Sequence, residues 1–298
     1  MSNSSRDITT LRAMIDRLPQ GGDRPAVIAL DRSAAVTWSY ERLSKEIDRL
    51  AAGLAGRGIG RRSHVGIMAG NSPRWVAACL AVIKAGAAPV PLDVQLDDKI
   101  LKAILDDSGA KLLFTTSDQR KRIERLAIGS VQPIFLDGED DDPSRWRGLS
   151  SDGSAKHAAA SDDDVATMFY TSGTTGTPKG VPLTHANLAF QLRAVIDCRI
   201  VAEGDRVLVP LPLHHVYPFV MGMLSPLAMH LPIIFPQALT GPQIVRALRE
   251  QSATAVVGVP RLYRAMYDGI EGRFRSRGLI ATSYFKLGIG LCTFCRRR

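Results

Sequence analysis

The sequence has few features of a secreted, metal-binding or nucleic-acid-binding protein. It contains only four cysteines in 298 residues, and its N-terminus is polar without the apolar segment of a secretory leader. We therefore expect reduced thiols and a cytoplasmic location. Cys292 and Cys295 have the spacing of half a zinc site, but no second Cys/His pair lies nearby, so no metal site is predicted. No aromatic-rich RNA motif or zinc-finger spacing is present, which excludes a nucleic-acid partner.

Charged residues are absent between Val207 and Val245. A run of this length is sufficient to span a bilayer. Seven prolines interrupt it, however, and a proline inside a helix costs on the order of 3 kcal/mol. We therefore expect two buried strands around one apolar helix, Tyr217–His230, rather than a membrane span.

Positive charge is concentrated at the C-terminal end. The net charge is +9, and residues 261–298 hold nine Lys or Arg but only two Asp or Glu. This pattern indicates either a helix that packs on a partner surface or, as the alternative, a peripheral contact with anionic membranes. The overall composition, with 45% hydrophobic and 22% charged residues, is that of a globular protein.

Apolar strand-like and amphipathic helix-like segments alternate along the chain. This order predicts an α/β fold: layered βα subdomains with largely parallel sheets flanked by helices. The expected helices are Ser39–Arg57, Pro73–Ala85, Asp97–Ser108, Thr184–Val195, Thr240–Gln251 and Pro260–Ile270. The expected strands are Val65–Ala69, Ala88–Leu92, Lys111–Thr115, Val165–Phe169, Val207–Pro210 and Thr254–Val259.

The most informative segment is Tyr170-Thr-Ser-Gly-Thr-Thr-Gly-Thr-Pro-Lys-Gly180, which directly follows an apolar run. Glycines allow a backbone to turn tightly beside a ligand, and consecutive amide groups in such a loop form a concave anion-binding surface. Hydroxyls add donors, and Lys179 adds a positive charge suited to phosphate. The Walker A spacing is not present, because Lys179 is followed by Gly180. The segment predicts a phosphate clamp for a nucleotide.

This string resembles the phosphate-binding signature of the adenylate-forming (AMP-binding) enzyme superfamily, and the chain is most like a long-chain fatty acid–CoA ligase. Further family-like segments occur in the family's order between about residues 25 and 270. They are Thr37–Leu43, Val65–Pro73, Ala78–Asp93, Leu211–His215 and Val259–Tyr263. The resemblance therefore covers most of the chain.

The resemblance also implies a domain organisation. Residues 1–24 form an N-terminal segment that precedes the domain. Residues 25–275 form an incomplete AMP-binding N-terminal domain, with subdomains at about 30–160 and 165–275. Residues 276–298 form a basic tail. We expect the chain to be the front part of such an enzyme. The family's magnesium-binding acid, its ribose-binding aspartate and the catalytic lysine of its C-terminal lid domain have no counterpart in these 298 residues.

The chemistry implied by the resemblance joins a carboxylate to ATP, with Mg²⁺, and releases pyrophosphate from an acyl-AMP. Coenzyme A then accepts the acyl group as a thioester. The residues expected to surround the β- and γ-phosphates are Thr171, Ser172, Gly173, Thr174, Thr175, Gly176, Thr177 and Lys179.

The candidates for the substrate pocket are His214, His215 and Tyr217. His215 matches the family's histidine beside the acyl pocket and the α-phosphate, whereas His214 stands where an aromatic residue is common. The absence of any acid over residues 207–245 disfavours an amino-acid substrate, since nothing there would bind an α-amino group. The segment His214–Phe219 and the length of the apolar stretch resemble long-chain fatty acyl-CoA synthetases, and this resemblance implies a long-chain fatty acid as the substrate.

Three interpretations remain open from the sequence. The chain is the N-terminal part of an acyl-CoA synthetase, a half-enzyme completed by a separately encoded C-terminal half, or a non-catalytic nucleotide- or lipid-binding module.

Overall fold

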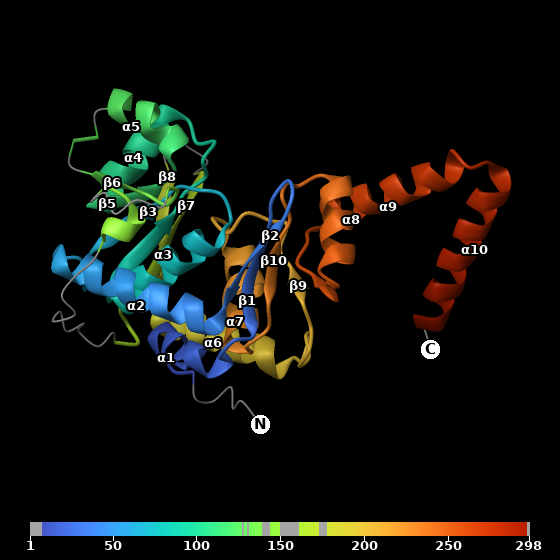
Figure 1. The fold of residues 1–298 in the computed structure, drawn as a ribbon, viewed down its shortest axis with the longest axis horizontal. Coiled ribbons are helices and arrows are strands. Elements are labelled where there is room, and N and C mark those ends of the chain that lie inside the picture. The colour runs from blue at the N-terminus through green and yellow to red at the C-terminus, as the bar shows by residue number, and fades with distance from the viewer. Residues whose placement is uncertain are drawn as a thin grey trace.

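A computed structural model describes residues 8–126, 128–129, 131–138, 144–149, 161–172 and 178–296 (Figure 1). Its strands form a five-stranded sheet in the order β11-β9-β10-β1-β2, a four-stranded sheet in the order β4-β3-β5-β6, and the hairpin β7-β8. The strands are β1 Pro25–Leu30, β2 Ala35–Ser39, β3 His64–Ile67, β4 Ala88–Pro91, β5 Leu112–Thr115, β6 Gln132–Phe135, β7 Val165–Ser172, β8 Pro178–Thr184, β9 Val207–Leu208, β10 Ile233–Phe235 and β11 Ala255–Val256.

Most strand pairs are parallel, as expected. Every pair of the four-stranded sheet is parallel, and so are the pairs β1-β10, β10-β9 and β11-β9. The pairs β1-β2 and β7-β8 are antiparallel and were not predicted. The predicted mixed α/β fold with mostly parallel sheets is confirmed.

The helices begin at the polar residues that the sequence places before them. Ser39, Ser72 and Thr184 each accept a hydrogen bond from a backbone amide in the first turn of the following helix, which satisfies an otherwise unpaired donor. The α-helices are α1 Leu11–Arg17, α2 Tyr40–Gly56, α3 Pro73–Lys84, α4 Asp98–Ser108, α5 Arg120–Leu126, α6 His185–Asp197, α7 Ser225–Ala228, α8 Gly241–Glu250, α9 Pro260–Arg275 and α10 Leu279–Arg296. The shorter helical segments are η2 Leu18–Gly21, η3 Ser117–Gln119, η4 Trp146–Gly148 and η5 Pro218–Leu224.

Helices cover both faces of the four-stranded sheet (Figure 1). On one face, Leu101 and Leu105 of α4 belong to the same buried cluster as Leu113 of β5. On the other face, Leu80 of α3 shares the main core with Phe114 of β5. Parallel strands need this double cover because their side chains are buried on both sides.

The five-stranded sheet combines distant parts of the chain. Val27 of β1 pairs with Ile233 of β10, and the hydroxyl of the buried Tyr40 donates to the carbonyl of Leu231 at 2.9 Å. Strands from before residue 40 thus complete a sheet whose other members lie beyond residue 200. The division into subdomains at about 30–160 and 165–275 stays a prediction.

The segment without charges folds as a helix between two buried strands, as predicted. Between β9 and β10 the chain forms η5, a π-helix, and then α7. A Cβ added at Gly222 would lie 2.7 Å from a methyl carbon of Val209, so only glycine allows η5 to approach β9 this closely. Among the described residues, no helix has both the length and the apolar content needed to cross a membrane.

Helices α9 and α10 extend away from the sheets (Figure 1). The ring of Phe285 joins the two helices, with its centroid 4.9 Å from that of Phe274 and 5.7 Å from that of Tyr267. The predicted basic tail is therefore helical over most of its length.

Candidate functional site

The hairpin β7-β8 flanks the predicted phosphate clamp. Five of the predicted residues lie outside the described residues: Gly173, Thr174, Thr175, Gly176 and Thr177. Ser172 ends β7 opposite Pro178, while its side chain also lies outside the description. Thr171 and Lys179 pair directly across the hairpin and are both exposed. Because directly paired residues point to the same side of a hairpin, the side chains of Thr171 and Lys179 leave the backbone next to each other at the base of the predicted clamp.

The histidine segment packs close to this hairpin. The ring of Phe169 in β7 meets the ring of Phe219 in η5 edge-on, with 5.2 Å between their centroids. The amide of Phe219 donates to the carbonyl of His215 at 3.0 Å. The strand leading into the clamp therefore packs against the helical turn that carries His215. The fold brings the two predicted motifs to one region.

Asn71 fixes the turn before the histidines. Its side-chain Nδ2 donates to the carbonyl of Leu211 at 2.9 Å, and its Oδ1 accepts from the amide of Leu213 at 3.0 Å. One side chain after β3 thus anchors the backbone two residues before the histidine pair. Asn71 occurs in a segment that resembles the family, but its role in joining two such segments was not predicted.

A pocket of about 290 Å³ opens where the carboxyl ends of β3, β4, β9 and β10 meet. This position is the usual place for ligands in open α/β sheets. The pocket is lined by Ala69, Gly70, Asn71, Asp93, Val94, Gln95, Val209, Pro210, Pro212, His214, Phe235, Pro236, Gln237, Ala238 and Leu239.

Of the three predicted pocket residues, only His214 lines this cavity. His215 is exposed, and its ring centroid lies 4.3 Å from that of His214. Tyr217 is also exposed, and its hydroxyl donates to the carbonyl of Gly258 at 3.2 Å. The rings of His214 and His215 therefore remain in contact, but of the three side chains only that of His214 faces the pocket.

His214 and Asp93 face each other in the pocket. Their Nε2 and Oδ2 atoms are 3.6 Å apart, and the side chains are 14% and 38% exposed. Burial lowers the pKa of His214; the Asp93 carboxylate opposes this change, and the neighbouring His215 adds to it. A neutral imidazole beside a carboxylate is therefore the form expected at neutral pH. Asp93 lies in a segment resembling the family, but sequence reasoning did not assign it a role.

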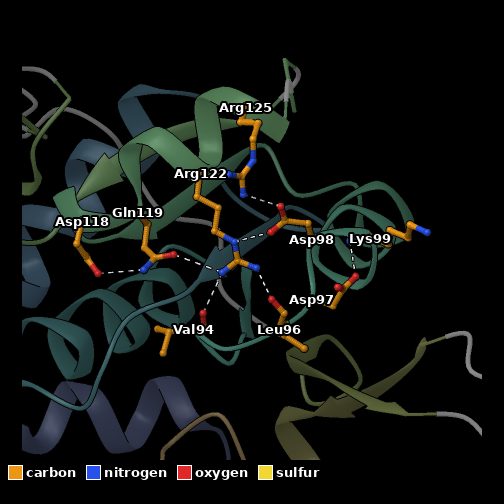
Figure 2. Close-up of polar contacts among 9 residues, drawn as sticks. All are labelled: Val94, Leu96, Asp97, Asp98, Lys99, Asp118, Gln119, Arg122 and Arg125. Carbon is orange, nitrogen blue, oxygen red and sulfur yellow. Dashed lines mark hydrogen bonds and ion pairs between the residues drawn. The ribbon is translucent and has the colours of Figure 1, made fainter.

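Arg122 of α5 holds the loop that carries Asp93 (Figure 2). Its guanidinium donates to the carbonyl of Val94 at 2.9 Å and to that of Leu96, and it pairs with Asp98 at 2.7 Å. Arg125 binds the other oxygen of Asp98 at 2.8 Å. Both arginines hold the pKa of Asp98 below its usual value. No local sequence signal could have identified Arg122, because its partners lie 24 to 28 residues earlier.

The described residues contain no group of three or more His, Cys, Asp or Glu side chains able to hold a metal ion. Cys79 is buried and Cys198 is exposed, and both are free thiols. The side chains of Cys292 and Cys295 lie outside the described residues.

Comparison with known proteins identifies the family of the chain. A family model described as AMP-binding enzyme matches residues 16–286. A feruloyl-CoA synthase of an Amycolatopsis species is 32% identical over 252 residues, which cover 83% of this chain and 48% of that protein. An oxalate–CoA ligase of Arabidopsis thaliana is 31% identical over 248 residues, covering 80% of this chain and 48% of the relative. The chain thus spans about half the length of these relatives.

Solved structures show the same fold. The inhibitor-bound N-terminal domain of FACL13 from Mycobacterium tuberculosis superposes with a TM-score of 0.76 at 23% identity, covering 87% of this chain and 65% of that one. An o-succinylbenzoate coenzyme A synthetase from Bacillus subtilis, in complex with ATP and magnesium, gives a TM-score of 0.70 at 23% identity. The superposition covers 86% of this chain and 51% of that one. Together with the family model, these similarities show that the chain belongs to the AMP-binding enzyme family.

Proposed function

We propose that this chain supplies the nucleotide- and acyl-binding half of an acid–CoA ligase. The reaction joins a carboxylate to ATP, forms acyl-AMP and pyrophosphate, and transfers the acyl group to coenzyme A. The observation that supports the proposal is the packing of Phe169 in β7, the strand before the proposed phosphate clamp, against Phe219 in η5, whose amide donates to the carbonyl of His215. Positioning of two anionic reactants is the main task of a protein in such a reaction.

The phosphate clamp is proposed to consist of Thr171, Ser172, Gly173, Thr174, Thr175, Gly176, Thr177 and Lys179. Lys179 is exposed, and no described carboxylate pairs with it, so its ammonium group is available to a phosphate. Mg²⁺ bound with ATP would neutralise part of the phosphate charge. His215 is proposed to lie beside the α-phosphate and the acyl carboxylate.

The clamp is tested by Lys179→Ala with ATP binding as the measurement. Removal of one charge-assisted contact, which contributes about 1.5 to 3 kcal/mol, should weaken ATP binding by at least tenfold. Lys99→Ala is the matched control, because Lys99 is an exposed lysine of α4 whose side chain points away from its neighbours in Figure 2. Equal ATP affinity in both variants and the parent chain would rule out the clamp.

For the substrate, we propose a long-chain fatty acid. The support is the lack of any acid over residues 207–245, which leaves no partner there for an α-amino group. The apolar side chains of η5 are mostly buried in the main core, and none of residues 216–229 lines the 290 Å³ pocket. Fatty-acid-dependent ATP–pyrophosphate exchange, measured with palmitate, ferulate and oxalate in parallel, tests the substrate class. Exchange that is faster with either shorter acid would contradict the fatty-acid proposal.

A separately encoded C-terminal half is the proposed partner if the 298 residues alone show ATP binding but no exchange. Adding the C-terminal half of a related ligase should then restore exchange.

A peripheral membrane contact is the second candidate function. The exposed apolar residues Leu279 (87% exposed), Ile280 (77%) and Tyr284 (70%) lie on the helix α10, within the strongly basic end of the chain. A second pocket, between α8 and α9, is lined by Arg246, Arg249 and Arg273 and by Glu250, which pairs with Arg246 at 2.9 Å. Apolar side chains beside basic ones are typical of helices that lie on anionic membranes. Co-sedimentation with phosphatidylserine vesicles, but not with phosphatidylcholine vesicles, is expected. The cytoplasmic location stays a prediction.

A further inference from the structure

The pair Asp93 and His214 has hydrogen-bonding capacity that no contact observed among the described residues fills. Oδ1 of Asp93 accepts from the amide of Gln95 at 2.9 Å, which closes a local turn. Oδ2 lies 3.6 Å from Nε2 of His214, too far for a good hydrogen bond. Two polar atoms therefore face each other across a gap at the wall of the 290 Å³ pocket.

The remaining polar groups around the gap limit what it can accept. Among the described residues that line the pocket there is no Lys or Arg, so the Asp93 carboxylate has no cation beside it there. Both ends of the Asn71 amide are already bonded to backbone. A carboxylate or phosphate of a ligand would therefore meet negative charge without compensation, whereas a neutral donor would be favoured.

A hydroxyl group matches this gap better than other small polar groups. It donates one hydrogen bond and accepts others, so it can donate to the Asp93 carboxylate while it accepts from or donates to the imidazole. An aliphatic or aromatic C–H can do neither, and it would leave both protein groups unpaired. The pocket volume, at roughly 30 Å³ per water-sized group, leaves room for about ten such groups.

We propose that Asp93 and His214 recognise a hydroxyl group on the acyl part of the substrate. This inference rests on the proposed acid-activating function and narrows its substrate to a hydroxylated acid. Selectivity of this kind requires both side chains to be held in place. Asn71 anchors the turn before His214, and Arg122 holds the carbonyls on either side of Gln95 (Figure 2). The pair thus joins two independently braced loops.

Calorimetric binding to the 298-residue chain tests the proposal with two matched pairs of acids. One pair is 3-phenylpropanoic acid and 3-hydroxy-3-phenylpropanoic acid, and the other is octanoic acid and 3-hydroxyoctanoic acid; each hydroxyl lies near the carboxylate because the rings of His214 and His215 are only 4.3 Å apart. In at least one pair the hydroxylated acid should bind about tenfold more tightly than its parent acid. One hydrogen bond to a charged group changes an affinity by about this factor. His214→Phe and Asp93→Ala should each abolish the difference.

Gln237→Ala is the control, because Gln237 lines the same pocket and is exposed. The Gln237→Ala variant should keep the preference for the hydroxylated acid within twofold of the parent chain. A loss of this preference as large as in His214→Phe would show that the general polarity of the pocket, and not the Asp93–His214 pair, is responsible. That result would overturn the proposal. Equal binding of both members in both pairs, or binding of neither, would also overturn it. ATP binding is measured in parallel to separate the proposed function from the hydroxyl recognition. Absence of ATP binding by the parent chain contradicts the proposed nucleotide site. Absence of a preference for the hydroxylated acids contradicts only the role of Asp93 and His214.

Discussion

Asn71→Ala offers the sharpest test of how the site is assembled. The side chain is partly buried and makes two backbone hydrogen bonds, at 2.9 and 3.0 Å, to Leu211 and Leu213. A typical intramolecular hydrogen bond contributes about 1 kcal/mol to stability. Truncation to alanine should therefore lower the free energy of unfolding by about 2 kcal/mol. The loss should reach the site directly, because the released turn ends at the histidine pair.

The measurement is equilibrium urea unfolding followed by far-ultraviolet circular dichroism. Asn187→Ala is the matched control, because it removes the same side chain from an exposed position. The side-chain oxygen of Asn187 accepts a hydrogen bond from the backbone amide of Thr184 at 3.1 Å. This substitution should cost less than about 1 kcal/mol. Asn71→Asp should fall between the parent and Asn71→Ala, since the carboxylate keeps the acceptor for Leu213 and loses the donor to Leu211.

Binding of the hydroxylated acids provides the second measurement on the same variant. Asn71→Ala should weaken acid binding more than ATP binding, because the released turn carries His214 of the pocket, whereas the proposed contacts to the β- and γ-phosphates come from the segment between β7 and β8. A cost for Asn71→Ala no larger than for Asn187→Ala would refute the assignment of Asn71 as the anchor of this turn.

Three further substitutions test the packing that supports the site. Gly222→Ala should lower the unfolding free energy by about 1 to 3 kcal/mol, because its Cβ would lie 2.7 Å from Val209; an unchanged urea midpoint would show that η5 moves freely. Tyr40→Phe should cost about 1 kcal/mol by leaving the carbonyl of Leu231 without its donor, as measured by the same unfolding. Burial lowers the pKa of His185, so the unfolded chain binds a proton at this residue more readily than the folded chain does. The free energy of unfolding should therefore have its full value above about pH 6.5 and fall as the pH drops below it. His185→Gln should flatten this part of the stability–pH curve, and an unaltered curve would assign it to other groups.

Much of the fold follows from local patterns. The seven predicted helices and the six strands predicted with bounds all occur, with bounds that differ by a few residues at most ends, because capping side chains and apolar periodicity act within one or two turns. The predicted helix Tyr217–His230 corresponds to η5 and α7. Strands β1, β2, β6 and β8 were not predicted. Strand β1 has a distant partner, since Val27 pairs with Ile233, and pairing over such a separation leaves no local signal. Strands β2 and β8 instead pair with β1 and β7, the strands directly before them, and these two hairpins were not predicted.

The sequence by itself determined the family and the α/β fold, because family motifs and the alternation of apolar strands and helices can be recognised in continuous strings of residues; the phosphate-clamp segment stays a prediction. Only the tertiary structure decided which side chains share the pocket. It placed His214 inside, left His215 and Tyr217 exposed, and brought Asp93 to His214 across 121 residues of chain. Such contacts depend on where separate strands end in one sheet, and that is set by the packing of the whole core rather than by any segment of it.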